Sequence, residues 1–475
     1  MEKNTLINNF CDKASKGEAA FFIGAGISVP YGLPDFEKLI KSLSKSILDL
    51  KIDKKTNYPE IAQYVLNEFN ERCEHCKLNE CDEFDTINKY NKRQIVEEVS
   101  TRFRPVKYDA SKSKYLDYIT RSHVNTIFTT NFDTLIEDCL DVNGIEYNAV
   151  SCNDELKYCF ETKSKKDIIK IHGDINSEDI IITKNDYEDF AENNRLFVRR
   201  LEQDLLTKSL LFIGYSYNDP NIQNIVNNVR LLIGGKSIEQ RHYMVLTKPK
   251  RRHEQELQDY WIKDLARYGI QVHLINKHSE LEAILREISF KSKGKTVYVT
   301  GSHKGNKSVE TYAKELGERL ADQEDIILNY GQSAGVGNLI FNAFGKRQID
   351  KGKSVNGRIR IFPNPYTFCD DWDNQDFLMS ELSNLRKELL QETRLMIAFP
   401  GGKGTKREIE IAEKTGTLII PFSPDKRVDN DFYDYLTQHT LVLKNLSKID
   451  ANYCKKFKRN TASIGDVIEC VNKNL

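Results

Sequence analysis

The chain has 475 residues, of which 39% are hydrophobic and 29% charged, which is enough for two or three domains with cores of their own. Its 70 Lys and Arg balance 70 Asp and Glu, which argues against a nucleic-acid coat protein or a polybasic membrane-surface protein. No apolar run approaches the roughly 18 residues of a spanning helix, no signal-peptide core follows Met1, and ten scattered Cys predict no disulfide framework. We therefore expect a cytoplasmic protein without membrane or nucleic-acid partners.

Short apolar runs recur along the whole chain and predict strands that are buried on both faces. They lie at 19–23, 124–129, 168–171, 210–213, 243–246, 297–299, 326–328, 359–362, 395–399 and 418–420. Between them, apolar residues follow helical spacing after Asp35, which is a suitable N-cap, and again from Tyr312 to Leu320. The alternation predicts an α/β fold with parallel sheets.

One segment separates two halves of this pattern. Residues 289–295 contain three Lys, two Ser and Gly294, and a new strand begins directly after them. We therefore predict two domains, 1–290 and 291–475.

The first predicted strand runs into the glycine-rich sequence Gly24-Ala25-Gly26-Ile27-Ser28. Glycines let the backbone approach a phosphate closely, and nearby N–H groups can then hold the anion. On its own this pattern fits an ordinary tight turn equally well.

Three more polar segments follow predicted strands: 129–133 with Asn131, His172-Gly173, and Gly214-Tyr215-Ser216. Ligands of open α/β sheets bind at these strand ends. A carboxamide such as Asn131 can donate to and accept from a ribose hydroxyl or water, and a histidine such as His172 can take a proton near neutral pH. The residues thus favour a nucleotide site with a general base.

The order of these segments, with Gly32-Leu33-Pro34-Asp35-Phe36 after the first, resembles the sirtuin family. The resemblance implies a Rossmann-type domain that cleaves NAD⁺, with Asn131 and His172 as catalytic residues. It also implies an NAD⁺ site formed by Gly24, Ala25, Gly26, Ser28, Asp35, Phe36, Thr130, Asp133, Gly214 and Ser216.

Two departures from the family narrow this expectation. Glu37 stands where sirtuins carry Arg, and the stretch between His172 and Gly214 contains no Cys for the zinc module of protein deacylases. The chain therefore resembles the shorter sirtuin-like domains that hydrolyse NAD⁺. Cys73, Cys76 and Cys81, with His75, are the only metal-like cluster, and we expect an ordinary reduced loop there and no bound metal.

The second half carries the most specific motif, Pro400-Gly401-Gly402-Lys403-Gly404-Thr405 with Glu408. Glycines again allow close approach to phosphates, basic side chains pair with them, and a carboxylate accepts from ribose hydroxyls. The motif resembles the SLOG superfamily, which includes phosphoribohydrolases and sensors of nucleotide signals. The resemblance implies a second Rossmann-like domain whose ligand contacts Gly301, Ser302, Gly331, Gly335, Gly337, Arg386, Lys387, Lys403 and Glu408.

A sirtuin-like domain followed by a SLOG domain resembles the effectors of Thoeris antiphage defence. The resemblance implies a homo-oligomer, tetrameric or larger, that depletes NAD⁺ once a cyclic ADP-ribose isomer binds the SLOG domain. A partner protein with a TIR domain would make that signal. A protein deacylase, a phosphoribohydrolase centred on the second domain, and a non-catalytic nucleotide-binding scaffold remain as alternatives.

Overall fold

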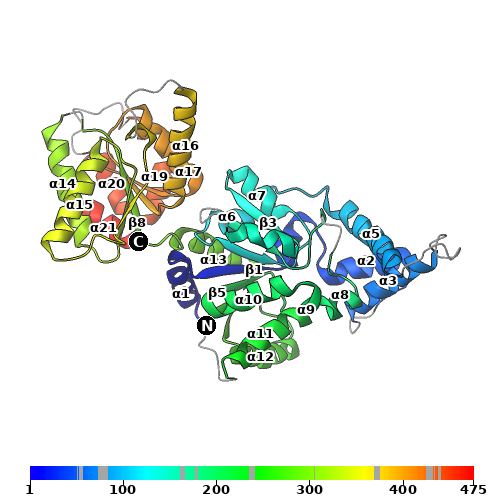
Figure 1. Ribbon diagram of the computed structural model, residues 1–475. Coiled ribbons are helices and arrows are strands. Elements are labelled where there is room, and N and C mark those ends of the chain that lie inside the picture. Colours follow the sequence, from blue (N-terminus) through cyan, green and yellow to red (C-terminus); the bar gives the residue numbers. More distant parts are fainter. Residues whose placement is uncertain are drawn as a thin grey trace. The chain divides into compact units, whose positions relative to one another are not determined.

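The computed structural model describes residues 1–50, 52, 57–72, 84–160, 166–176, 180–234, 241–303, 305–367, 375–423, 432, 434–436 and 440–475. They form two compact units, Met1–Ser292 and Lys293–Leu475 (Figure 1). Each unit contains a parallel sheet with helices around it, which confirms the predicted α/β class.

The sheet of the first unit has seven strands in the order β3-β4-β2-β1-β5-β6-β7. All neighbouring pairs are parallel, and in the centre Phe22 of β1 lies level with Phe128 of β2 and Phe212 of β5. The strands are β1 (Ala19–Ile23), β2 (Thr126–Thr129), β3 (Tyr147–Val150), β4 (Lys166–Lys170), β5 (Ser209–Ile213), β6 (His242–Thr247) and β7 (Ile270–Ile275).

Helices cover both faces of this sheet (Figure 1). Phe21 of β1 points to the apolar cluster that includes α1, α6 and α13, whereas Phe22 points to the cluster that includes α10, α11 and α12. The helices are α1 (Lys3–Ser15), α2 (Phe36–Ile47), α3 (Tyr58–Arg72), α5 (Phe84–Phe103), α6 (Tyr115–Arg121), α7 (Leu135–Asn143), α8 (Lys184–Glu188), α9 (Phe190–Asn193), α10 (Arg195–Thr207), α11 (Pro220–Leu232), α12 (Arg252–Arg267) and α13 (His278–Lys291), with the 3-10 turns η1 (Ala25–Ile27), η2 (Val29–Tyr31) and η3 (Asn153–Phe160).

The sheet of the second unit has five parallel strands in the order β10-β9-β8-β11-β12. The strands are β8 (Thr296–Thr300), β9 (Ile327–Tyr330), β10 (Ile359–Ile361), β11 (Leu395–Ala398) and β12 (Leu418–Pro421). The helices are α14 (Lys307–Asp322), α15 (Val336–Asp350), α16 (Gln375–Gln391), α17 (Lys403–Thr415), α19 (Thr440–Ile449), α20 (Ala451–Arg459) and α21 (Ile464–Asn474), with the turn η4 (Pro365–Thr367).

The two units meet between Ser292 and Lys293. Helix α13 continues to Lys291, so Ser289 and Lys291 belong to a helix. Ser292 is buried and its hydroxyl accepts from the His123 N–H at 2.9 Å. Lys293 is buried in the other unit, where its Nζ donates to the Thr393 carbonyl at 3.2 Å. Each side of the junction is therefore anchored within its own unit.

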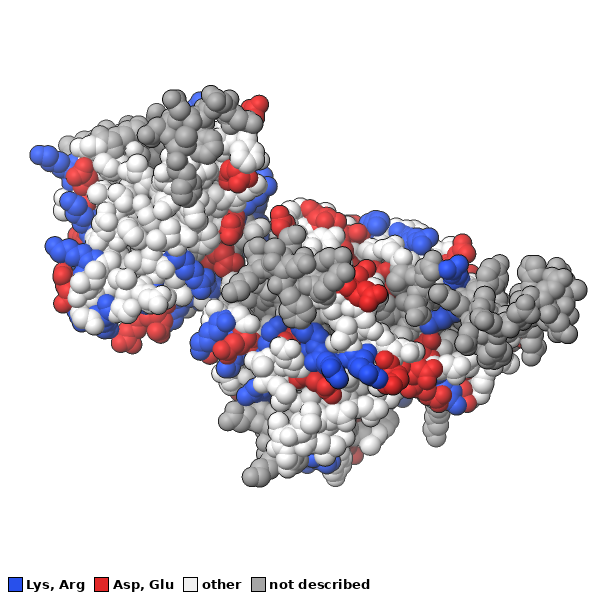
Figure 2. All heavy atoms as spheres, in the orientation of Figure 1, with Lys and Arg blue, Asp and Glu red and all other residues white. Residues whose placement is uncertain are grey.

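Charges of both signs lie side by side on the visible face of each unit (Figure 2). This mixture agrees with the formal net charge of zero. None of the helices that the structure describes is both long enough and apolar enough to cross a membrane.

Candidate active site

A cavity of about 700 Å³ lies at the carboxyl ends of the strands in the first unit. Strand β1 has β2 on one side and β5 on the other, so the chain changes direction across the sheet here, which is where ligands of open α/β sheets bind. The lining residues are Ala25, Gly26, Ser28, Val29, Pro34, Asp35, Phe36, Glu37, Leu39, Asn57, Tyr58, Pro59, Phe103, Thr130, Asn131, Phe132, Asp133, His172, Tyr187, Gly214, Tyr215, Ser216, Asn218, Asp219 and Pro220.

All residues predicted to bind or cleave NAD⁺, except Gly24, line this cavity. Gly24 lies directly behind the lining, where its carbonyl accepts from Asn131 Nδ2 at 3.4 Å. The structure thus brings together segments that are separated by up to about two hundred residues in the sequence.

Asn131 follows β2, and hydrogen bonds within the protein fix its backbone N–H and its side-chain Nδ2. Its backbone N–H donates to Thr129 Oγ1 at 3.0 Å, and its Nδ2 donates to Ser28 Oγ at 3.1 Å. Its side-chain oxygen Oδ1 is buried and has no hydrogen-bond partner within the described part of the chain. A buried acceptor without a partner costs free energy, so Oδ1 is suited to accept a hydrogen bond from a bound hydroxyl or water.

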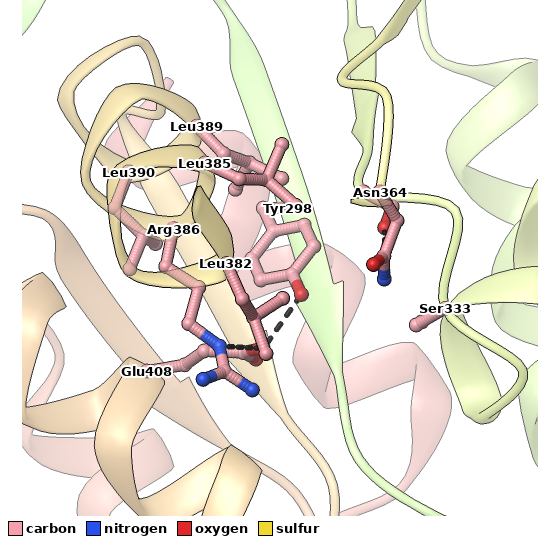
Figure 3. Close-up of a pocket in the computed structure, with 10 residues that line it drawn as sticks. Tyr298, Ser333, Asn364, Leu382, Leu385, Arg386, Leu389, Leu390 and Glu408 are labelled. Atoms are coloured by element: carbon pink, nitrogen blue, oxygen red, sulfur yellow. Dashed lines mark hydrogen bonds and ion pairs between the residues drawn. The ribbon is translucent and has the colours of Figure 1, made fainter. Parts of the chain in front are cut away.

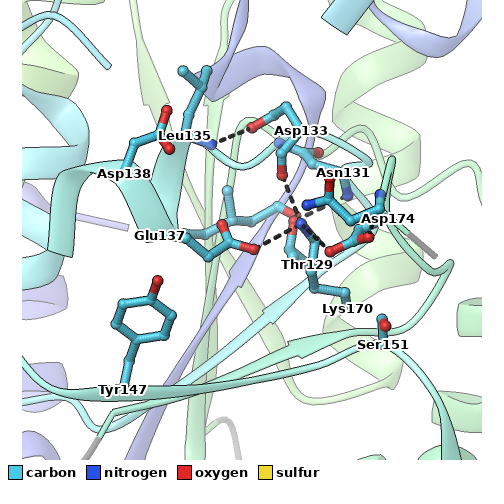
Figure 4. A network of polar contacts seen from close by, with 12 residues as sticks. Thr129, Asn131, Asp133, Leu135, Glu137, Asp138, Tyr147, Ser151, Lys170 and Asp174 are labelled. Atoms are coloured by element: carbon cyan, nitrogen blue, oxygen red, sulfur yellow. Dashed lines mark hydrogen bonds and ion pairs between the residues drawn. The ribbon is translucent and has the colours of Figure 1, made fainter. Parts of the chain in front are cut away.

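Asp133, Glu137, Lys170 and Asp174 form a buried polar network (Figure 4), and Ser28 is bound to it through Asp133. Ser28 Oγ donates to Asp133 Oδ2 at 2.7 Å, and the carbonyl of Asp133 accepts from Lys170 Nζ at 2.7 Å. Lys170 also donates to Glu137 Oε1 at 2.8 Å and lies 3.4 Å from Asp174 Oδ2. Burial raises the pKa of Asp133, although Ser28 and Lys170 oppose this effect. For Lys170, burial lowers the pKa, but Glu137 and Asp174 outweigh it and keep the amine charged.

His172 follows β4 and is also buried, with 4% of its side chain exposed. Its ring meets Tyr187 and Phe190 edge-on, at centroid distances of 5.6 and 5.9 Å. Its Nε2 lies 3.1 Å from Asp219 Oδ2, yet the direction is not that of a hydrogen bond, and Nε2 has no hydrogen-bond partner among the residues that the structure describes. Nε2 is thus available to take a proton from a ligand or water.

The glycines of the turn after β1 let this turn pack closely against the turn after β5, in addition to leaving space for a ligand. Gly26 N–H donates to the Gly214 carbonyl at 2.9 Å, so the turns after β1 and β5 touch through their backbones. A Cβ at Gly24 would lie 2.6 Å from the Gly214 oxygen, and one at Gly26 would lie 2.9 Å from the Gly214 Cα. Larger residues at these positions would separate the two turns that form the cavity.

The cavity lining is acidic. Asp35, Glu37, Asp133 and Asp219 contribute to it, and none of the lining residues in the described part of the chain is Lys or Arg. Asp35 also caps α2 by accepting from the Lys38 N–H at 2.9 Å. Glu37, which replaces the sirtuin Arg, pairs with Lys41 at 2.6 Å, and this contact lowers the pKa of Glu37.

Tyr187, Tyr215 and Asp219 are among the lining residues that were not predicted from the sequence. The hydroxyl of Tyr215 is buried and has no hydrogen-bond partner among the described residues, and burial raises its pKa well above the usual value. Asp219 precedes Pro220 in a sequence typical of a helix start, which predicts an N-cap but gives no sign of its contact with His172. Only the fold brings Asp219 to His172.

The second unit has a smaller cavity of about 80 Å³ at the ends of its strands (Figure 3). Arg386 of α16 and Glu408 of α17 line it and form an ion pair at 3.3 Å. The other carboxylate oxygen of Glu408 accepts from Tyr298 at 3.1 Å and from Thr300. Burial, followed by the charge of Glu408, raises the pKa of Tyr298 well above its usual value. Glu408 therefore has a partner for each oxygen.

The structure gathers only part of the predicted signal site around this cavity. Gly331, Arg386 and Glu408 line it, whereas Lys387 and Lys403 are exposed and do not line it. Gly301, Ser302, Gly335 and Gly337 also lie outside the lining, and Gly301 packs against Phe399, since a Cβ there would lie 2.5 Å from the Phe399 Cβ.

Within the described residues, no group of three or more His, Cys, Asp or Glu could hold a metal ion. Cys73, His75, Cys76 and Cys81 lie outside the described residues. The expectation of an ordinary loop at these positions stays a prediction.

Two family models match the chain. A SIR2-like domain matches residues 125–270, and the Sir2- and TIR-associating SLOG family matches residues 280–475. These matches confirm the sirtuin-like and SLOG resemblances.

Three relatives named NAD(+) hydrolase ThsA are similar over most of the chain. The protein of Acinetobacter baumannii (strain 532279) is 29% identical over 462 residues, which cover 88% of this chain and 87% of the relative. The Bacillus cereus (strain MSX-D12) protein is 25% identical, covering 91% of this chain and 89% of the relative. The Enterococcus faecium protein is also 25% identical, covering 92% and 91%.

Proposed function

We propose that this chain, a homologue of the ThsA NAD(+) hydrolases with a SIR2-like domain followed by a SLOG domain, hydrolyses NAD⁺ to nicotinamide and ADP-ribose. The reaction would take place in the cavity of the first unit and serve antiphage defence. The observation that carries the proposal is that Asn131 and His172 line one cavity, and that Asn131 Oδ1 and His172 Nε2 are buried without a hydrogen-bond partner among the described residues.

The chemistry requires little covalent help from the protein. When the bond between nicotinamide and ribose breaks, its electron pair leaves with the neutral base and the ribose develops positive charge. Water then adds to the sugar carbon and loses a proton. Asn131 Oδ1 would accept from a ribose hydroxyl or from this water, and His172 Nε2 would take the proton. No step calls for a metal.

The deacylase alternative gains no support from the segment that would carry its zinc module. Between His172 and Gly214 the described residues form α8, α9 and α10, and the sequence there contains no Cys. The scaffold alternative does not account for a buried histidine that lines the cavity and whose Nε2 has no hydrogen-bond partner among the described residues.

Release of nicotinamide from NAD⁺ by the full-length protein tests the proposal directly. We expect Asn131→Ala and His172→Ala to lower the rate by at least about 10²-fold, because a positioned acid or base typically contributes 10²–10⁴-fold. Thermal unfolding should show that both variants remain folded.

Asn185→Ala and His253→Ala are matched controls, since both residues are exposed and do not line the cavity. They should release nicotinamide at the rate of the unchanged protein. A full rate in folded Asn131→Ala or His172→Ala would contradict the assignment of the active site.

We further propose that the second unit regulates the first. A cyclic ADP-ribose isomer, made by a TIR-domain partner, would bind at Gly331, Arg386 and Glu408 and activate a cytoplasmic homo-oligomer. The cavity of about 80 Å³ is smaller than ordinary ligand sites of about 300–1,000 Å³. Binding would therefore separate Arg386 from Glu408 and widen the cavity, with Arg386 turning to a phosphate of the signal.

A further inference from the structure

The loop between β5 and α11 is held firmly against the cavity. Tyr217 in this loop has a φ of +55°, a conformation that is costly for a bulky residue. Its ring meets Phe212 and Tyr215 edge-on at 6.1 and 6.3 Å, and its carbonyl accepts from Gln223 Nε2 at 2.6 Å. These contacts fix the position of Asp219, which follows two residues later.

Asp219 uses its two carboxylate oxygens for different partners. Oδ1 accepts from the N–H groups of Asn221 at 2.9 Å and Ile222 at 3.3 Å, and so caps α11. Oδ2 lies 3.1 Å from His172 Nε2, and the Asp219 side chain is 8% exposed. A cap needs only one oxygen, so capping alone does not account for the place of Oδ2.

We propose that Asp219 is a positioning residue for His172, an inference that rests on the proposed NAD⁺ hydrolysis. When Nε2 takes the proton from water, the imidazole becomes a cation in a buried site. The Asp219 carboxylate would stabilise that cation, and with Tyr187 and Phe190 it would fix the ring toward the cavity. Because Oδ2 does not hydrogen-bond with Nε2, that nitrogen stays free for the proton.

Asp219→Asn separates this role from capping. Asn is as good an N-cap as Asp and has nearly the same shape, but it carries no charge. Asp450→Asn is the matched control, because Asp450 caps α20 in the second unit by accepting from the Tyr453 N–H at 2.9 Å.

We expect Asp219→Asn to lower kcat for nicotinamide release by about 10- to 100-fold, with KM changed by less than about twofold. In a His172→Ala background the same change should cause no further loss, because residues that act as one unit are not additive. Asp450→Asn should leave kcat unchanged. An equal loss with and without His172, or a raised KM with unchanged kcat, would show that Asp219 acts on the substrate and overturn the inference.

A second measurement does not depend on turnover. In protein with ¹⁵N-labelled histidine, the signals missing from His172→Ala identify the His172 imidazole. They should shift in Asp219→Asn and stay in place in Asp450→Asn. Unshifted signals in folded Asp219→Asn would refute the inference, whereas absence of nicotinamide release from the unchanged protein would refute the proposed function alone.

Discussion

Lys170 is the buried cation on which the polar network beside the cavity depends. Only 1% of its side chain is exposed, and its amine contacts the Asp133 carbonyl, Glu137 and Asp174. Removing one member of a buried ion pair leaves the other charge without compensation. Stability and the position of Asn131 should therefore change together when Lys170 is replaced.

We expect Lys170→Met to lower the free energy of unfolding by about 3–5 kcal/mol, as measured by urea denaturation. The lost contact with Asp133 should also loosen Ser28 and slow nicotinamide release. In Lys170→Met with Glu137→Gln, part of the stability should return, because the carboxylate left unpaired is then neutral. Lys184→Met, at an exposed pair with Glu188, is the control and should cost less than about 1 kcal/mol. Equal costs at Lys170 and Lys184 would contradict this account.

His242 in β6 should make the stability of the first unit depend on pH. It is buried, and its Nδ1 accepts from the Leu210 N–H at 3.2 Å. Burial, and then the charge of Arg241, lowers the pKa of His242 from 6.5 to about 3. Between these two values the unfolded chain binds a proton that the folded chain does not.

Stability should therefore fall as the pH drops from 6.5 toward about 3, by up to about 1.4 kcal/mol per pH unit from this group. We expect His242→Asn, which keeps an acceptor near the Nδ1 position, to lose less stability over this range. Urea denaturation at several pH values measures the difference. If both proteins show the same dependence, His242 is not the group that titrates.

At the scale of elements, the sequence predicted the central strands and missed two at the edges of the first sheet. The central strands are apolar runs because helices cover both of their faces. Strand β7 (Ile270–Ile275) alternates Ile, Gln, Val and His, and β3 (Tyr147–Val150) buries only Val150. These two edge strands lack the continuous apolar run, so a search for such runs cannot find them.

The candidate site was predictable where the chemistry is local to a strand end, as for Asn131 and His172. It was not predictable where a residue acts through a distant partner. Lys170 owes its position to the parallel register of β4 beside β2, and Asp219 owes its position to the loop between β5 and α11. The ligand role predicted for Lys387 and Lys403 rested on their charge and on the SLOG resemblance. Both side chains are exposed to solvent beyond the cavity lining, and their role stays a prediction.

The contact between the turns after β1 and β5 should make Gly214 harder to replace than a glycine with open space around it. Gly214 has a φ of +63°, and a Cβ there would lie 2.7 Å from the Ile27 nitrogen. Gly144 has the same φ, but a Cβ there would have no atom of the described residues within 4 Å. Gly144→Ala should therefore cost about 1 kcal/mol from the backbone alone, and Gly214→Ala several kcal/mol together with the loss of NAD⁺ binding. Calorimetric unfolding and NAD⁺ titration measure both, and equal costs would exclude the clash.

At the scale of the whole molecule, the two cavities should respond to different changes. We expect Arg386→Ala to abolish activation by a cyclic ADP-ribose isomer, because a lost charge-assisted contact weakens binding by about 1.5–3 kcal/mol. Lys403→Ala, at an exposed residue outside the cavity lining, should weaken activation less than Arg386→Ala does. Cleavage that does not depend on the signal should persist in both variants, since the first unit is unchanged.

Calorimetric titration of the full-length protein with the signal provides the measurement. Arg319→Ala is the control, because Arg319 lies on α14, pairs with Glu315 and is half exposed. If Arg386→Ala binds the signal as tightly as the unchanged protein, the sensor site lies elsewhere. If Glu408→Gln instead abolishes release of a base from a nucleoside monophosphate, the phosphoribohydrolase alternative gains support.

The acidic lining of the larger cavity should affect the release of the product after cleavage. NAD⁺ arrives with a positively charged nicotinamide ring, which Asp35, Glu37 and Asp219 attract. Cleavage removes that positive charge, so the ADP-ribose left behind carries more negative charge than the substrate did. NAD⁺ is itself a net anion because of its diphosphate, so these side chains would repel the product more strongly than the substrate. In the proposed reaction the lining would thus favour product release.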